Sequence, residues 1–157
     1  MTTHYRHLLP LLFMIISCGS KAGDETTDHE LISKIAKREG TTVEEVKKSL
    51  EEGCSSGVTP YMRQCAYLNE VGEDIKLNET YQKLLRSLET PAAKQKLIKA
   101  QRAWLSFRDA TCEYEAIAWT GGTGYGVVHS GCLAIMTSRR NQDLQSYASC
   151  DGSGCPR

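Results

Sequence analysis

Seven cysteines are the residues of this 157-residue chain with the most distinctive chemistry. Cysteine thiols form disulfides, bind metals, carry lipids or act as nucleophiles, and their spacing narrows these options. No two are spaced as Cys-x-x-Cys and the histidines do not group with them, so the sequence predicts no metal site. So many cysteines in a short chain then favour disulfides in an oxidising compartment. The four histidines are His4, His7, His29 and His129.

Cys18 is set apart from the other six because it follows an apolar leader. The run Leu8–Ile16 is too short to span a membrane, which takes about 20 residues, but it suits the core of a secretory signal. It continues into Ser17-Cys18, and the segment resembles a bacterial lipobox, in which the cysteine is lipidated and becomes the first mature residue. We therefore expect a lipoprotein signal peptide at 1–17 and a flexible tether at 18–28. The alternative is an ordinary signal peptide with an incidental cysteine.

This leader predicts where the mature protein resides. Acyl chains such as palmitate on Cys18 would anchor it to the bacterial cell envelope. The expected location is the periplasmic face of the outer or inner membrane, or the cell surface.

The sequence contains no recognisable catalytic constellation. Glu113 and Glu115 are the best candidates for paired carboxylates, but residues two apart on a helix do not share a face. No serine or cysteine has a histidine base placed for it, and the run TGGTGYG lacks the lysine and hydroxyl residue of a phosphate-binding loop. We therefore expect a protein that is not an enzyme and has no cofactor.

The composition indicates one globular domain, and the charges are distributed unevenly along the chain. The chain is 40% hydrophobic and 24% charged, with a formal net charge of +0. Nucleic-acid binding requires a basic surplus to neutralise phosphates, so no nucleic acid is expected as a partner. Residues 24–52 carry nine acids and five bases, whereas residues 54–150 carry nine acids and eleven bases. The N-terminal segment is therefore the one that would attract a basic protein.

Residues 29–53 are predicted to form a two-helix hairpin. Gly40 is suited to end the first helix, and Thr42 with Glu45 forms a capping box that begins the second. The hairpin resembles a small helix-turn-helix, but its acidic charge and its position behind a signal peptide disfavour DNA binding. We expect it to pack against the rest of the chain. The apolar residues at helical spacing in its first half are Leu31, Ile32, Ile35 and Ala36.

Residues 54–149 are predicted to form a domain of three longer helices. They run from about Pro60 to Thr90, from about Ala92 to Trp119 and from about Cys132 to Ala148. Thr120–Gly131 contains five glycines in twelve residues, so we expect a non-helical loop there. The predicted fold is an all-α, disulfide-stapled helical bundle with the N-terminal hairpin attached.

Two of these helices have clear inward faces. One is Leu77, Tyr81, Leu84 and Leu88, and the other is Leu97, Gln101, Trp104, Arg108 and Cys112. Trp104 is expected in the core. Arg108 on the same face needs a partner, because an unpaired buried charge is costly, and we expect it to be Asp74, with Asn78 one turn later. The alternative is that these residues form a binding or active site.

Six cysteines remain after Cys18 and can form three disulfides in fifteen ways. An antiparallel arrangement of the first two long helices would bring Cys65 to Cys112. Cys54 would then pair with Cys132, and Cys150 with Cys155 would close the tail at 150–157.

The spaced residues of the body resemble the LprI-type family of exported bacterial proteins, which are described as lysozyme inhibitors. The pattern comprises Cys54, Met62, Cys65, Asp74, Leu77, Asn78, Tyr81, the block Gln101–Leu105, the block Phe107–Ala110, Cys112, Cys132, Thr137, Arg140 and Leu144. The block QRAWLSFRDATC, which includes Asp109, is its most specific part. This resemblance implies a cysteine-stapled helical domain outside the cytoplasm, and a lysozyme as protein partner. The hairpin and the tail lie outside the pattern.

The glycine-rich segment is the predicted contact element. Cys112 and Cys132 flank it, and loops held by a rigid scaffold concentrate binding residues. Tyr125 and His129 could then supply stacking and a hydrogen bond to a lysozyme cleft. Two alternatives remain: the segment is only a flexible connector, or the protein is a structural or adaptor lipoprotein with no lysozyme partner.

Overall fold

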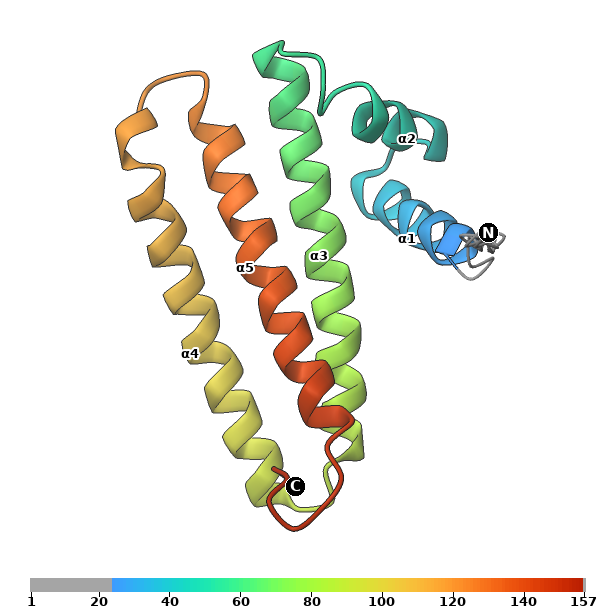
Figure 1. Ribbon diagram of the computed structural model, residues 1–157, viewed down its shortest axis with the longest axis vertical. Coiled ribbons are helices and arrows are strands. Elements are labelled where there is room, and N and C mark those ends of the chain that lie inside the picture. Colours follow the sequence, from blue (N-terminus) through green and yellow to red (C-terminus); the bar gives the residue numbers. More distant parts are fainter. Residues whose placement is uncertain (1–23, 157) are drawn as a thin grey trace, which may run out of the picture.

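The computed structural model describes residues 24–156, and all regular structure in this range is helical (Figure 1). The elements are α1 Asp24–Glu39, α2 Val43–Glu51, α3 Thr59–Ser87, α4 Pro91–Glu115, the 3-10 turn η1 Ile117–Trp119 and α5 Tyr125–Ala148. Helices α3, α4 and α5 form an elongated bundle, and α1 and α2 lie against one side of α3. This confirms the predicted all-α bundle with an N-terminal hairpin.

The predicted leader and Cys18, the predicted lipidation site, lie outside the described residues. The tether predicted at 18–28 overlaps α1, which begins at Asp24. No helix of the described chain is both long enough and apolar enough to cross a membrane.

The hairpin forms as its sequence predicts. Thr42 Oγ1 accepts a hydrogen bond from the Glu45 backbone N–H at 3.2 Å, and the Glu45 carboxylate accepts one from the Thr42 backbone N–H at 3.1 Å. Gly40 reverses the chain between the helices with a φ of +66°, which glycine adopts without steric cost. A core shared with α3 holds the hairpin in place, and its buried members are Ile35, Ala36, Val46, Leu68 and Val71.

The long helices begin where proline and threonine permit. Pro60 occupies the first turn of α3, where a missing N–H costs nothing. Thr90 caps α4 by accepting a hydrogen bond from the Ala93 N–H at 3.1 Å, and Pro91 follows it. The predicted inward faces then meet in a second core of Leu77, Leu84 and Leu144, with Tyr81, Leu97 and Trp104 packed against it.

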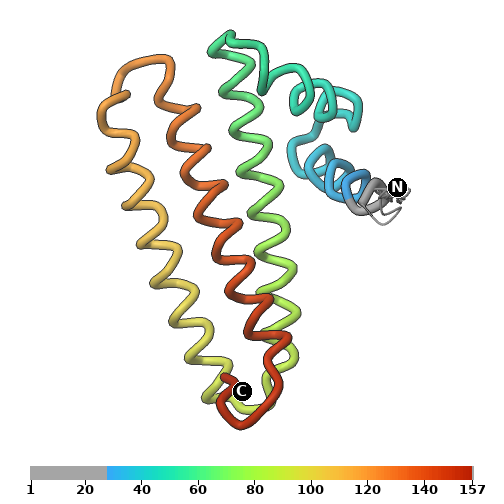
Figure 2. The backbone as a smooth tube through the Cα atoms, in the orientation of Figure 1, coloured from blue at the N-terminus to red at the C-terminus, as the bar shows by residue number. Residues whose placement is uncertain are grey.

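The order of the helices across the bundle differs from their order in the chain. Figure 2 shows that α3 and α5 run in the same direction, and that α4 runs opposite to both. In Figure 1, α5 lies between α4 and α3. The central helix is therefore the last one in the chain.

This order corrects the predicted disulfides. The predicted pairs Cys65–Cys112 and Cys54–Cys132 are wrong, because α5 separates the end of α4 from the start of α3. Cys112 instead bonds to Cys132 on α5, with Cα atoms 5.5 Å apart, and Cys65 bonds to Cys54 just before its own helix, with Cα atoms 5.3 Å apart. The predicted Cys150–Cys155 pair in the tail is confirmed.

The loop formed by the glycine-rich segment Thr120–Gly131 is also shorter than predicted. Helix α5 begins at Tyr125, so the expectation of a non-helical chain up to Gly131 is wrong. A Cβ atom at Gly126 would lie 2.7 Å from the Arg63 side chain, so this glycine lets α5 approach α3 closely. Tertiary packing here outweighs the weak helix propensity of glycine.

Candidate functional site

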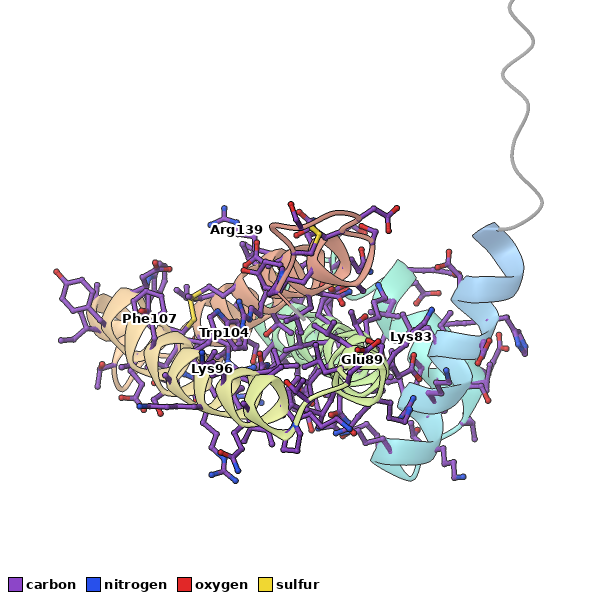
Figure 3. The ribbon with its side chains drawn as sticks, turned by 90° about the horizontal axis from the view of Figure 1, so that it is seen from below. Lys83, Glu89, Lys96, Trp104, Phe107 and Arg139 are labelled. Atoms are coloured by element: carbon purple, nitrogen blue, oxygen red, sulfur yellow. A yellow bond between two sulfur atoms is a disulfide. The ribbon has the colours of Figure 1, made fainter. Side chains whose placement is uncertain are left out.

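Two arginines, one from α4 and one from α5, flank Trp104 where these two helices meet. The Arg108 guanidinium carbon, on α4, lies 5.4 Å from the Trp104 ring centroid, and that of Arg140, on α5, lies 5.8 Å from it. Their side chains are only 13% and 11% exposed. Figure 3 shows Trp104 on the side of α4 toward α5. Cations held this close to an aromatic face are stabilised by its negative charge density.

Hydrogen bonds satisfy both arginines further. Arg108 donates from Nε and Nη2 to Asp109 Oδ1, at 2.9 and 2.7 Å, and from Nη1 to Thr137 Oγ1 at 3.1 Å. Arg140 donates from Nε to Oε1 of the buried Gln101 at 3.1 Å. These contacts connect α4 to α5 through charged groups that have partners, so burying them is tolerable.

Asp74, the predicted partner of Arg108, has a divided role. Its Oδ1 lies 3.9 Å from Arg108 Nη1, while its Oδ2 accepts a shorter hydrogen bond of 2.9 Å from Arg38 Nη1 on α1. Asp74 therefore joins the hairpin to the bundle, and Asp109 is the closer partner of Arg108. Asn78, one turn along α3, is exposed.

The cluster around Trp104 is a structural contact between helices α4 and α5. Within residues 24–156, no three histidine, cysteine, aspartate or glutamate side chains gather in a way that could hold a metal ion. Arg108 and Arg140 are committed to neighbouring side chains, and Trp104 is half-buried against the apolar core. The arrangement supports the structural interpretation of Gln101, Trp104 and Arg108.

Several exposed apolar side chains lie at the end of the bundle where α3 begins and α4 ends. We define the apolar end as Val58, Tyr61, Tyr114, Ile117 and Trp119, all exposed residues at the start of α3, the end of α4 and the η1 turn. In Figure 1 these segments lie at the same end of the bundle, with the start of α5 between the end of α4 and the start of α3. Tyr114, Ile117 and Trp119 are 75%, 64% and 52% exposed. Apolar exposure of this kind is typical of an interaction surface.

Local structure fixes the position of Trp119 within the apolar end. A Cβ atom at Gly124 would lie 2.6 Å from the Trp119 ring, so the indole packs directly on the backbone where α5 begins. Gly121, with a φ of +77°, turns the chain between them. The Cys112–Cys132 disulfide ties α4 to α5 just below this turn. Trp119 is therefore presented by a braced turn.

Tyr125 and His129 lie on the first turns of α5, where their rings stack with centroids 5.3 Å apart. Both are half-buried, so each has less free surface than the exposed residues of the apolar end. Sequence reasoning missed Tyr114, Ile117 and Trp119. The available signal was that Tyr114 and Ile117, although large and apolar, are not spaced to continue the inward face of Leu97, Gln101, Trp104, Arg108 and Cys112.

Comparison with known proteins assigns this chain to a family. The family model described as "Lysozyme inhibitor LprI" matches residues 52–144, which include α3, α4 and most of α5. An uncharacterized protein of Rhizobium meliloti (strain 1021) is 30% identical over 108 residues, which are 60% of this chain and 78% of that protein. No solved structure matches significantly. The matched residues contain the Trp104 cluster, the disulfide below the turn and the apolar end, and the chain belongs to the LprI lysozyme inhibitor family.

Proposed function

We propose that this protein is a lipid-anchored protein of the cell envelope that binds and inhibits lysozyme, the peptidoglycan muramidase, through the apolar end of its bundle. It does so by occupying the enzyme and performs no chemistry of its own. The family supports an inhibitor role. The observation that supports this choice of contact surface is the exposure of Tyr114, Ile117 and Trp119 beside a turn that a disulfide braces.

The chemistry of the apolar end suits a lysozyme cleft. Such a cleft binds sugar rings with aromatic side chains and carries carboxylates, so it accepts aromatic groups and hydrogen-bond donors. Tyrosine and tryptophan contribute most to protein interfaces, and rigid presentation lowers the entropy cost of binding. Tyr125 and His129 lie in the first turns of α5, directly after the turn, and would add contacts to those of Trp119.

A turbidity assay of cell-wall lysis by lysozyme tests the contact surface. Replacing Tyr114 and Trp119 together with alanine should weaken inhibition at least about tenfold, because interface energy concentrates in a few aromatic residues. Phe107→Ala is the matched control, since Phe107 is an equally exposed aromatic of α4 that lies about two turns from the end of the helix. Equal inhibition by the parent and the double variant would place the contact elsewhere, and the acidic hairpin would be examined next.

Membrane anchoring is tested separately through Cys18. In the proposal, Cys18→Ser removes the only acylated residue, so the mature protein should appear in the soluble fraction while still inhibiting lysozyme. Retention of the Cys18→Ser protein on membranes after a high-salt wash would contradict the lipid anchor.

A further inference from the structure

A second feature lies at the opposite end of the bundle from the apolar end. A cavity of about 590 Å³ opens between the end of α3, the start of α4, the last turns of α5 and the C-terminal tail. Its volume is within the range of small-molecule sites. Figure 1 shows the C-terminus at this end of the bundle, close to the start of α4. Cys155 and Pro156 of the tail line the cavity.

The walls of the cavity are largely aliphatic. Leu84 of α3, Leu88 just after α3 and Leu97 of α4 line the cavity, and Leu84 and Leu97 also belong to the core on which Trp104 packs. Ala93 and Ala100 are small, so the space beside α4 stays open. An elongated hydrocarbon group would therefore find apolar contacts along the helices.

The charged groups of the cavity are both cations. Lys96 and Arg140 line it, and none of its lining residues is an acid. Within the described chain Lys96 makes no ion pair, and Arg140 uses only Nε in a hydrogen bond, to Gln101. The nearest carboxylate to Arg140 is that of Asp143, at 3.7 Å from Nη1 and more than half exposed. Within the described chain, Nη2 of Arg140 donates no hydrogen bond, and Lys96 is exposed beside the cavity. Both cations can therefore pair with a ligand that brings a negative charge.

We propose that this cavity binds a single-chain amphiphile with an anionic head, of the fatty carboxylate class. The hydrocarbon chain lies along Leu84, Leu88 and Leu97, and the carboxylate is held by Lys96 and by Nη2 of Arg140. The cavity is separate from the surface proposed to bind lysozyme, so the ligand site can be tested independently of the inhibitor function.

Isothermal titration calorimetry of the purified protein with dodecanoate, below its micelle concentration, tests the site. Saturable binding is expected at one ligand per chain. Dodecanol has the same chain without the charge and should bind at least about tenfold more weakly, because its hydroxyl cannot form an ion pair with either cation. Acetate carries the charge without the chain and should show no measurable binding.

Matched pairs of variants on α4 separate this site from general adsorption. Lys96→Gln should weaken dodecanoate binding at least about fivefold, whereas Lys99→Gln, an exposed lysine outside the cavity, should leave it unchanged. Ala100→Phe should fill the cavity and abolish binding, whereas Ala103→Phe, outside it, should not. Circular dichroism verifies that each variant is folded.

Four results would overturn the proposal. They are the absence of saturable dodecanoate binding, equal affinity for dodecanol, equal effects of Lys96→Gln and Lys99→Gln, and unchanged binding to the folded Ala100→Phe protein. A preference for phosphatidylglycerol vesicles over free dodecanoate, lost in Ala100→Phe, would instead assign the cavity to a membrane lipid and refute the free single-chain ligand.

Discussion

The two tryptophans of the chain should separate stability from binding. Trp104 is half-buried between Arg108 and Arg140 and packs on the core of Leu77, Leu84 and Leu144. Truncating a core aromatic to alanine costs about 3–5 kcal/mol, and each stacked guanidinium contributes about 0.5–1 kcal/mol. Because Trp104 is only half-buried, its packing loss should be near the lower limit. We expect Trp104→Ala to lower the free energy of unfolding by about 4 kcal/mol.

Urea denaturation followed by far-ultraviolet circular dichroism measures this loss, which should also lower the melting temperature by about 10–20 °C. Trp104→Phe keeps an aromatic face for both arginines and should cost about 1–2 kcal/mol. Trp119→Ala is the matched control, because that exposed side chain should contribute less than about 1 kcal/mol to stability while its loss weakens inhibition. If Trp104→Ala unfolds like the parent but fails to inhibit lysozyme, the Trp104 cluster is a binding site and the structural interpretation is refuted.

Three further predictions concern the covalent, ionic and pH-dependent parts of the fold. Peptide mapping under non-reducing conditions should recover Cys54–Cys65, Cys112–Cys132 and Cys150–Cys155, and a Cys65–Cys112 peptide would contradict the central position of α5. Arg108→Ala should lower the free energy of unfolding by about 2 kcal/mol in urea titrations, because it removes the hydrogen bond to Thr137 and the contact with Trp104. Asp74→Asn should lower it by less than about 1 kcal/mol, since Asp74 is partly exposed. Hydrogen bonds from Thr41 and Thr42 hold the pKa of Glu45 below its ordinary value of 4.5. Its carboxylate therefore stabilises the folded hairpin above about pH 4.5, and this contribution is lost as the pH falls through the lower folded-state pKa. The stability difference between the parent and Glu45→Ala should accordingly be constant near neutral pH and shrink in acid, and a difference that grows in acid would be inconsistent with the capping role.

Helix positions were largely predictable because they follow from local patterns. The stripe from Leu77 to Leu88 and the caps at Thr42 and Thr90 depend only on residues within a few turns of one another. The disulfide pairs were not predictable in this way, because they depend on which helices are neighbours. Placing α5 between α3 and α4 changes the partner of Cys112 without changing any helix boundary.

The candidate site shows the same division. The inward positions of Gln101, Trp104 and Arg108 follow from their spacing on one helix. The spacing also places Tyr114 off this inward face, but whether another helix covers it depends on where the neighbouring helices end. Likewise, Gly126 is helical because α3 approaches it through Arg63, a contact 63 residues away in the sequence that no local pattern reports.

Stoichiometric inhibition of lysozyme tests the central claim most directly. The purified protein is titrated into a fixed amount of enzyme in the cell-wall lysis assay, against animal-type, goose-type and invertebrate-type lysozymes. We predict that at least one type loses its activity linearly and reaches its minimum near one inhibitor per enzyme, with no change in the inhibitor itself. Full lytic activity of all three enzymes at a large molar excess would contradict the inhibitor function, and a structural or adaptor role in the envelope would then describe the protein better.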